Sequence, residues 1–447
     1  MAGSFVRKMM TGVVTFAMAG ALLAGCAQER SGGTPSSGST NQSAGANKEK
    51  ETIEFVYWAG AGGEEEAFRD LVAKFEAEHP DIKVNAQQVP SPSSSDYYTK
   101  IQTRIAGNDA PDVFRIQYQK IGEFASKKAL LDVTDLFAED KENFNQSLLT
   151  AVSFEDKIYG LPHHTDTLAV FYNKTYMDQL GVEPPSKLED AWTWGEFLEV
   201  AKMIQDKGLA QYGLAFNWKE SSAYRSLPFF FQNGASLATD DFTKGNVETE
   251  EAIQTLAFLQ NMFQTVMSPG NSMKGTEDFN LLFTSGTAGM LINGNWMIPR
   301  WEQEMVDYEW GVTYMPQNKS MASDMGGNAL AIPKNSKHAE AAKKFLAFMG
   351  EPENMKLFVE KGLFLPGRTD IEGPFEYNVK DPAMMDLFIE QSTTVPEKLA
   401  QTVTMSEFSK ANQALAEALE MLFTQGVTPE DAAKTLNAKL DEIFGGK

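Results

Sequence analysis

The sequence predicts an α/β fold made of two lobes. Between residues 52 and 89 a strand, a helix and a second strand follow one another with short turns, the order of a βαβ unit in a parallel sheet. About 395 residues follow position 51, more than a single hydrophobic core usually serves. Residues 160–174 join the turn-forming GLPHHTD to the apolar, β-prone run LAVFY, so we expect the chain to pass from one lobe to the other there.

The first lobe is predicted to begin with a strand over 52–58, in which Ile53, Phe55 and Tyr57 alternate with residues of the other face. A glycine turn leads into a helix over 64–79, whose apolar residues recur at helical spacing and which Pro80 ends. The next expected elements are a strand over 82–89, a helix over 98–106 and a strand over 113–117.

Beyond residue 174, local signals mark the helices and strands. Thr193 and Glu196 have the spacing of a capping box, and Thr428 with Pro429 has the pattern of an N-cap and first helical residue for the last helix. The other expected elements are strands over 212–218, 288–292 and 328–333 and helices around 252–263 and 341–348.

The N-terminus has the pattern of a targeting segment. Arg7 and Lys8 precede an apolar run over 11–24 that is too short for an ordinary membrane span, which predicts a signal peptide over 1–25. Leu23-Ala24-Gly25-Cys26 resembles the bacterial lipobox, in which the cysteine carries a diacylglycerol anchor; the alternative is an ordinary cleaved signal with an incidental cysteine. Residues 26–51 are rich in Ser, Gly and Asn and read as a flexible tether.

Composition excludes several classes of function. With 61 acidic and 39 basic residues the net charge is -22, which disfavours nucleic acid as a partner. Cys26 is the only cysteine, so no intrachain disulfide and no cysteine-based metal site can form. No second run of about 20 apolar residues appears, so we expect the membrane to be reached through the lipid anchor only.

Several segments, in order, resemble the family 1 extracellular solute-binding proteins, which deliver carbohydrates to ABC importers. The matching segments are FEAEHPDIKV, APDVFRIQ, GLPHHTDTLAVFYNK, TWGEF, FFQNGASL, GTAGMLINGNW, GGNALAIPKNSKHAEAAKKFLAFM and LPGR. The resemblance implies a two-lobed periplasmic-binding-protein-like fold of type II, each lobe a mostly parallel sheet flanked by helices. It places lobe I at 52–162 plus 326–363, lobe II at 166–322 plus 368–447, and hinges near 163–165, 323–325 and 364–367.

The function implied by this resemblance is capture of a mono- or oligosaccharide by closure of the lobes and delivery to the permease subunits of an ABC importer. The protein would be a monomer without a cofactor, lipid-anchored at the extracytoplasmic face of the cell membrane. Two alternatives stay open, a binding protein for a non-sugar solute and a secreted enzyme that acts on glycans. The enzyme would need two carboxylates flanking one bond, and the sequence has no G-x-S-x-G, H-E-x-x-H or Walker motif.

Three tryptophans and one glutamine follow predicted strands, and ligands lie beyond the carboxyl ends of strands in doubly wound sheets. Trp58, Trp218 and Trp296 can each offer an indole face to the apolar face of a sugar ring, with burial in the core or at the rim as the alternative. Gln117 ends the strand over 113–117 and offers an amide.

Five further residues are candidate ligand contacts. The carboxylate of Asp166 can accept two vicinal hydroxyls, or it can cap the hinge turn. Gly327 lets the backbone approach a ligand and Asn328 offers an amide that both donates and accepts. Arg368 can close on hydroxyls or pair on the surface with the aspartate two residues later, and Glu65 is a weaker candidate.

The pair His163-His164 beside Asp166 raises the question of a metal site. Adjacent residues of an extended segment point in opposite directions, so both imidazoles would not meet one ion. A third nitrogen or sulfur ligand at motif spacing is missing from the sequence. We therefore expect no metal and treat the polar residues of this stretch as candidate ligand contacts.

Overall fold

A computed structural model describes residues 50–60, 63–90, 96–305 and 309–445, which belong to one compact unit. The predicted signal peptide, the lipid attachment at Cys26 and the tether up to residue 49 lie outside the described residues. Within the described ranges, no helix combines the length and the apolar character needed to cross a membrane.

The larger sheet has six strands, which lie in the spatial order β12 (Leu365–Pro366), β6 (Leu161–Thr165), β11 (Asn328–Ala331), β3 (Val113–Gln117), β1 (Glu51–Tyr57) and β2 (Ile82–Gln88). Strand β1 pairs in parallel with β2 and β3. Helices α1 (Glu64–Glu78) and α2 (Asp96–Ala106) make the two crossovers that this parallel pairing requires. The predicted βαβ unit is therefore confirmed.

The smaller sheet has four strands, in the order β10 (Trp310–Thr313), β7 (Leu168–Asn173), β9 (Ala288–Gly294) and β8 (Tyr212–Phe216). Only β8 and β9 are parallel there, and β11, β6 and β12 pair in antiparallel fashion in the larger sheet. The prediction of mostly parallel sheets is wrong, because most pairings in each sheet are antiparallel. Strands β7 and β11 follow directly on a strand of the other sheet, without the crossover helix that parallel pairing needs.

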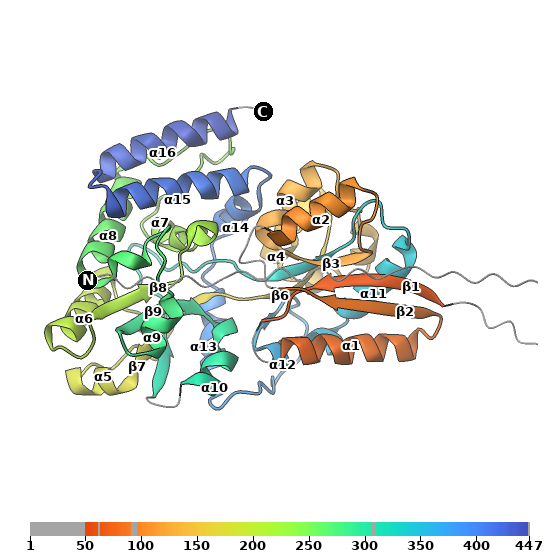
Figure 1. Cartoon of the computed structure of the whole chain (residues 1–447), viewed down its shortest axis with the longest axis horizontal. Coiled ribbons are helices and arrows are strands. Elements are labelled where there is room, and N and C mark those ends of the chain that lie inside the picture. The colour runs from red at the N-terminus through yellow and green to blue at the C-terminus, as the bar shows by residue number, and fades with distance from the viewer. Residues whose placement is uncertain (1–49, 61–62, 91–95, 306–308, 446–447) are drawn as a thin grey trace, which may run out of the picture. The chain divides into compact units, whose positions relative to one another are not determined.

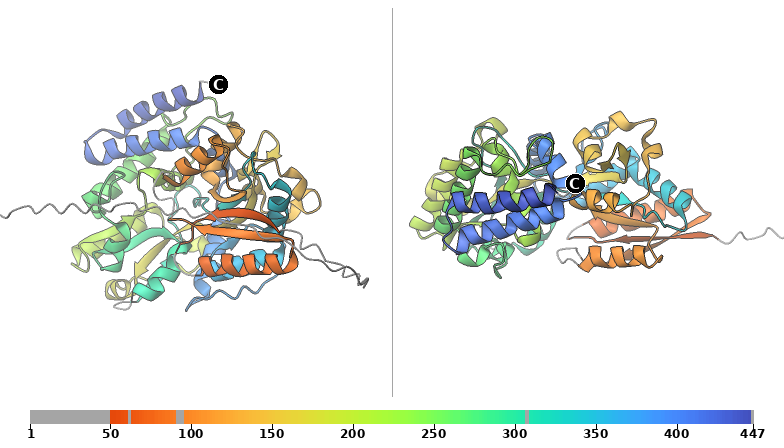
Figure 2. Two further views of the ribbon diagram at one scale, coloured as in Figure 1. Left: turned by 45° about the vertical axis from the view of Figure 1, so that its right-hand side comes forward. Right: turned by 90° about the horizontal axis from the view of Figure 1, so that it is seen from above.

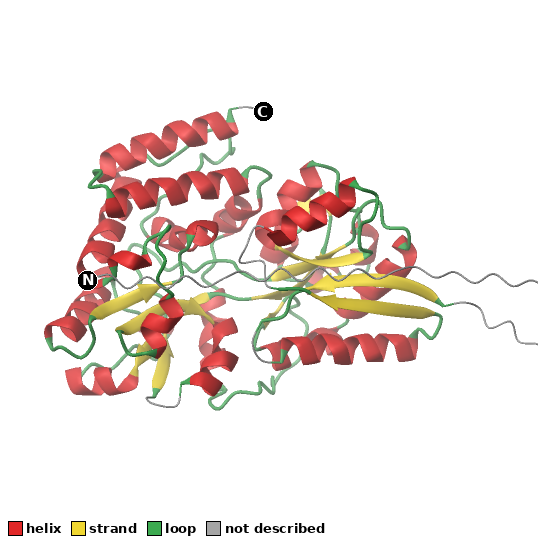
Figure 3. Cartoon of the chain, viewed as in Figure 1, coloured by secondary structure: helices red, strands yellow, loops and turns green. Residues whose placement is uncertain are grey.

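Helices cover both faces of the larger sheet (Figures 1 and 3). Helix α1 packs with α11 (Ala339–Gly350) and α12 (Pro352–Gly362) on one face, and α2 lies with α3 (Tyr118–Ser126) on the other. Strands β4 (Ser153–Phe154) and β5 (Lys157–Ile158) form a separate two-stranded sheet. The other α-helices are α4 (Gln146–Ala151), α5 (Lys174–Leu180), α6 (Trp194–Asp206), α7 (Leu227–Gln232), α8 (Glu250–Val266), α9 (Phe279–Thr284), α10 (Ile298–Glu304), α13 (Ala383–Ser392), α14 (Glu397–Thr404), α15 (Phe408–Thr424) and α16 (Pro429–Phe444).

The two predicted helix starts are confirmed. The side chain of Thr193 accepts a hydrogen bond from the amide of Glu196, whose carboxylate accepts from the Thr193 amide in return, so the capping box of α6 is complete. Thr428 caps α16 by accepting from the amide of Asp431, and Pro429 takes the first helical position, where its missing amide proton costs nothing.

The prediction of a turn at GLPHHTD is wrong, because Leu161–Thr165 is strand β6, paired on both sides. Pro162 cannot donate to a ladder, and the register of β11 shifts between Asn328 and Ala329, opposite this proline. Such an irregularity absorbs the missing donor. Pairing with two neighbouring strands outweighs the local turn propensity.

The chain passes between the two sheets three times, and the right-hand view of Figure 2 shows the two halves of the fold side by side. It leaves β6 after residue 165 and enters β7 at residue 168, and it returns from β10 to β11 through residues 314–327. After β12 it continues to α13, which packs on β7 and β10. A hinge is defined by motion, so the hinges near 163–165, 323–325 and 364–367 and the lobe boundaries stay predictions.

Candidate functional site

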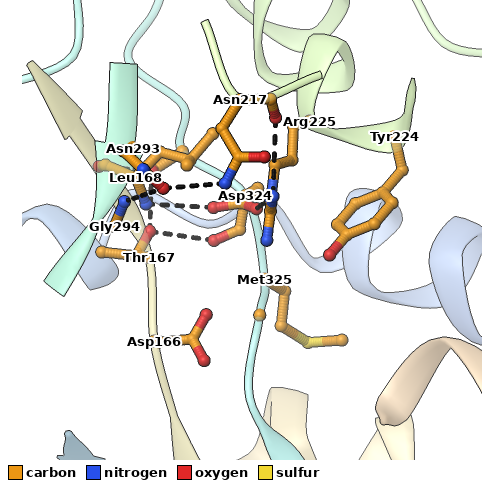
Figure 4. A network of polar contacts seen from close by, with 12 residues as sticks. Asp166, Thr167, Leu168, Asn217, Tyr224, Arg225, Asn293, Gly294, Asp324 and Met325 are labelled. Carbon is orange, nitrogen blue, oxygen red and sulfur yellow. Dashed lines mark hydrogen bonds and ion pairs between the residues drawn. The ribbon is translucent and has the colours of Figure 1, made fainter. Parts of the chain in front are cut away.

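Two of the crossing segments run side by side and are joined by hydrogen bonds (Figure 4). Thr167 Oγ1 lies 2.9 Å from the carbonyl oxygen of Asp324, and the amide of Leu168 donates to Asp324 Oδ1 at 3.0 Å. Further along, the amide of Gly326 donates to the carbonyl of Asp166 at 3.0 Å. These bonds determine together where both segments place their side chains.

The polar sequence at the end of β9 ties the same region to the third crossing. The side chain of Asn295 accepts from the amide of Thr167 at 3.2 Å and donates to the carbonyl of Leu363 at 2.6 Å. A Cβ atom on Gly294 would lie 1.8 Å from the ring of Trp296, so only glycine lets this indole fold back over the end of the strand. Trp296 is half-buried in this position.

An arginine covers one face of this indole. Arg225, from the 3-10 helix Glu220–Ser226, places its guanidinium carbon 4.8 Å from the ring centre of Trp296 and 5.6 Å from that of Tyr224. Its Nη1 reaches the carbonyl of Asn217 only at 3.5 Å. Its Nε is buried without a hydrogen-bond partner among the described residues and lies 3.9 Å from Asp324 Oδ2 (Figure 4).

Asp166 points a carboxyl group into this cluster, where it accepts no hydrogen bond from any described residue (Figure 4). Only 8% of Asp166 is exposed, and this burial, together with the nearby carboxyl of Asp324, raises its pKa to about 7 against the opposing charge of Arg225. Burial likewise raises the pKa of Asp324 to about 6. A carboxyl with free acceptor capacity can accept hydroxyl groups of a ligand, and an indole face can stack on the apolar face of the same ligand.

On the side of the larger sheet, two predicted site residues are register partners, Gln117 in β3 and Asn328 in β11. Gln117 Oε1 accepts from the hydroxyl of Tyr98 at 3.2 Å. Gly327 has a φ of 101°, and a Cβ there would lie 2.4 Å from the carbonyl oxygen of His164. Glycine is required at this position because two backbones meet, whatever its role toward a ligand.

A buried network lies beneath these residues. Arg115, in the middle of β3, is 1% exposed, and its Nη1 donates to Glu64 at 2.7 Å and to the carbonyl of Trp58 at 2.6 Å. Its guanidinium lies 4.8 Å from the ring centre of Trp58. The Asn328 amide oxygen is oriented toward His164 Nε2 and Arg115 Nη2, each 3.1 Å away. The network thus holds Trp58 and Asn328 in fixed positions.

The structure does not bring Trp218 to this cluster. Its side chain is 0% exposed, donates from Nε1 to the carbonyl of Asn271 at 2.7 Å and stacks on Phe216 with ring centres 4.6 Å apart. Strand-like alternation at the end of β8 sends Trp218 into the core, whereas the side chain of Asn217 donates to Asn293 Oδ1 at 2.8 Å and its carbonyl oxygen faces Arg225. This placement is the core alternative that the sequence left open.

Arg368 and Glu65 also lie apart from the cluster. Arg368 binds both carboxylate oxygens of Asp370, at 2.8 and 2.7 Å, and Asp140 at 2.7 Å, which is the pairing that the sequence offered as the alternative to a ligand contact. Glu65 is exposed on the first turn of α1, whereas its neighbour Glu64 is the buried partner of Arg115.

The two histidines of the crossing stretch are core residues. Both side chains are 0% exposed, and His163 packs between Phe68 and Phe358 with ring centres 5.8 and 4.2 Å away. Burial lowers the pKa of His163 to about 3 and that of His164 well below its usual value. Asp166, 8% exposed, is the charged side chain of this stretch with free acceptor capacity, whereas the partnerless ring nitrogens of His163 are enclosed in the core.

Sequence reasoning missed Tyr224, Arg225, Asp324 and Asn217. Asn217 could have been found by applying strand alternation to the residue before Trp218. Arg225 and Asp324 are about a hundred residues apart in the sequence, and neither lies in a motif, so only the folded chain shows that they meet.

Two mixed α/β sheets joined by three crossing segments, with an indole, an arginine and free carboxyl groups where the crossings meet, define a two-lobed binding protein for small solutes. The sequence profile of the bacterial extracellular solute-binding proteins matches residues 61–356, about two thirds of the chain, and the protein belongs to this family. The family consists of binding proteins rather than enzymes, and its members act outside the cytoplasm.

Among curated proteins, the chain is 26% identical over 377 residues to an arabinooligosaccharide-binding protein of Bacillus subtilis, covering 80% of each chain. It is 24% identical to the galactooligosaccharide-binding protein of the same organism, covering 91% of this chain and 94% of the other. A solved ABC substrate-binding protein of Listeria monocytogenes in complex with cycloalternan superimposes with a TM-score of 0.74 at 26% identity, covering 89% of this chain and 99% of the other. A sugar-binding protein of Xanthomonas citri, 24% identical with a TM-score of 0.71 and coverage of 88% and 98%, shows the same fold.

Proposed function

We propose that this protein captures an uncharged mono- or oligosaccharide between its two lobes and delivers it to the permease of an ABC importer. The observation that carries the proposal is that Arg225 adjoins both an indole and a free carboxyl: its guanidinium carbon lies 4.8 Å from the ring centre of Trp296, and its charge acts on the carboxyl of Asp166. Stacking on the ring and directional hydrogen bonds to a carboxylate are the two interactions that a saccharide needs. The relatives named for binding arabinooligosaccharide and galactooligosaccharide support it.

The charged residues around the site indicate that the ligand is uncharged. Asp166 and Asp324 both face Arg225, while Arg115 is already paired with Glu64. A uronate or phosphorylated sugar would add negative charge beside two buried carboxyl groups, which costs free energy in a region screened from water.

Ligand contacts are assigned to Trp58, Gln117, Asp166, Trp296 and the segment 327–328. Asp166, Asn217 and Tyr224 are only 7 to 8% exposed, so a saccharide reaches them only after the covering groups move. Rotation of the lobes about the predicted hinges supplies that movement, and a ligand that contacts both lobes then favours the closed form.

The protein is further proposed to be a monomeric lipoprotein. Cleavage after residue 25 would leave Cys26 as the lipidated N-terminus, and the residues between Cys26 and strand β1, which begins at Glu51, would tether the binding domain to the outer face of the cell membrane. Replacing Cys26 by serine should release the protein from the membrane fraction of its host into the medium. Membrane retention of that variant would overturn the anchor.

A thermal-shift screen of the mature protein against neutral mono- and oligosaccharides tests the function. A saccharide present at one hundred times its Kd should stabilise the protein by about 2.7 kcal/mol and raise its Tm accordingly. A response to peptides or polyamines with none to saccharides would favour another solute. Conversion of an oligosaccharide to smaller products would favour an enzyme.

Two tryptophan variants separate the site from the core. Trp296→Ala should weaken saccharide binding by about tenfold or more with little change in stability, because the ring is half-buried at the site. Trp218→Ala should lower the free energy of unfolding by about 3 to 5 kcal/mol and leave the affinity of the folded protein unchanged, because this ring fills the core. Calorimetric titration and urea unfolding measure the two effects, and the reverse pattern would exchange the two roles.

The affinity of the wild-type protein for a neutral saccharide should rise from about pH 6 to about pH 8, because the ionised carboxylate is the better acceptor and the pKa of Asp166 lies at about 7. Asp166→Asn should bind about ten- to a hundredfold more weakly and show a flatter pH profile, since the amide does not titrate. Unchanged affinity in this variant would remove Asp166 from the site.

A further inference from the structure

Arg225 and Asp324 form an ion pair that is close but not hydrogen-bonded. Arg225 Nε and Asp324 Oδ2 are 3.9 Å apart, and neither atom has a hydrogen-bond partner among the described residues. Their side chains are 14% and 1% exposed, so water does not readily replace the missing bond. Two buried, complementary groups without partners are unfavourable and call for a reason.

The position of the guanidinium supplies that reason. The group lies over the indole of Trp296, 4.8 Å from the ring centre, and beside Tyr224. It therefore occupies an aromatic face on which a sugar ring would stack. The attraction of the Arg225 guanidinium to the Trp296 ring therefore competes with a hydrogen bond to Asp324. A short movement of the arginine side chain would make that hydrogen bond.

Asp324 connects this choice to the crossing segments. Its Oδ1 accepts from the amide of Leu168 at 3.0 Å, and its carbonyl oxygen lies 2.9 Å from Thr167 Oγ1. A guanidinium that binds the carboxylate of Asp324 is therefore linked, through these hydrogen bonds, to both crossing segments (Figure 4).

We propose that Arg225 is a positioning residue that senses the ligand: a sugar stacking on Trp296 displaces the guanidinium from the ring onto Asp324, completing the ion pair. The inference rests on the proposed function, and it identifies the arginine–aspartate pair as part of the binding free energy. The bond exists in the complex and not in the free protein, so it favours the bound arrangement.

The test uses Arg225→Met, which keeps the aliphatic stem, Asp324→Asn, which keeps an acceptor for Leu168, and the double variant. In the free protein, the urea midpoints of the two single variants and the double variant measure the attraction that the two charges, 3.9 Å apart, have before a ligand binds. In calorimetric titrations with arabinotriose and with maltotriose, each single variant should bind at least about tenfold more weakly, and the double variant no more weakly than either single one. Arg300→Met, exposed on α10, is the matched control and should leave affinity unchanged.

The outcomes distinguish this inference from the function. Losses of affinity that add in the double variant would overturn the sensing role while saccharide binding stands, and so would tighter binding by Arg225→Met. If the wild-type protein binds neither these saccharides nor any in the thermal-shift screen, the proposed function fails and the inference fails with it.

Discussion

Replacing Arg115 by methionine should lower the free energy of unfolding by about 3 to 5 kcal/mol, because it leaves Glu64 as a buried carboxylate without its partner. The substitution also removes the donors to Trp58 and Asn328, so the remaining folded protein should bind saccharides more weakly. Urea unfolding followed by far-ultraviolet circular dichroism measures the first effect, and calorimetric titration the second.

A control and a compensating variant make this prediction specific. Arg300→Met removes an exposed pair with Glu304 on α10 and should cost about 0.5 kcal/mol or less. Adding Glu64→Gln to Arg115→Met should recover part of the loss, because the glutamine keeps an acceptor for the amide of Gly60 without a buried charge. A loss as small as that of Arg300→Met would show that the buried pair contributes little.

His163→Leu should stabilise the protein, and more so in acid. Both ring nitrogens of His163 are buried without partners among the described residues, so at neutral pH leucine should add about 1 to 2 kcal/mol. The pKa of His163 is about 3 in the folded protein against 6.5 when exposed, so the unfolded chain binds the proton first and stability falls as pH drops below 6.5 toward 3. Near pH 4.5 this cost reaches about 2 to 3 kcal/mol for this histidine alone.

Urea midpoints of the wild type and His163→Leu at several pH values measure the difference. The raised pKa values of Asp166 and Asp324 have the opposite effect on the free energy of unfolding, because protonation removes buried charge as the pH falls. Both proteins contain these two residues, so their effect cancels in the comparison. Equal acid sensitivity in wild type and His163→Leu would show that His163 does not carry this cost.

The order of helices and strands was predictable because it depends on patterns among residues that are close in the sequence. Alternation of apolar residues predicted β1, helical spacing predicted α1, and the caps at Thr193 and Thr428 were correct in both helices. Pairing direction was not predictable in this way. Whether β6 is a turn or a strand depends on β11 and β12, which are far away in the chain and supply its hydrogen bonds.

The candidate site was predictable in part. Trp296 and Asp166 carry functional groups whose chemistry suits a sugar, and in the structure Asp166 lies on a crossing segment and Trp296 contacts Arg225, which lies beside Asp324 of another. Trp218 and Trp296 each stand two residues after a strand, yet Trp218 lies in the core, whereas the 3-10 helix Asn295–Met297 and the space left by Gly294 let Trp296 fold back over the end of β9.

The sequence by itself determined an α/β chain, the segments that cross between its sheets, and the residue types that a solute site requires. Only the tertiary structure decided which of those residues face one another: it paired Arg115 with Glu64 in the core, left Arg225 over Trp296 and placed Asp324 just out of its reach. The physical reason is that helix and strand propensities act between near neighbours, whereas burial, charge pairing and ring contacts act between residues that only the folded chain brings together.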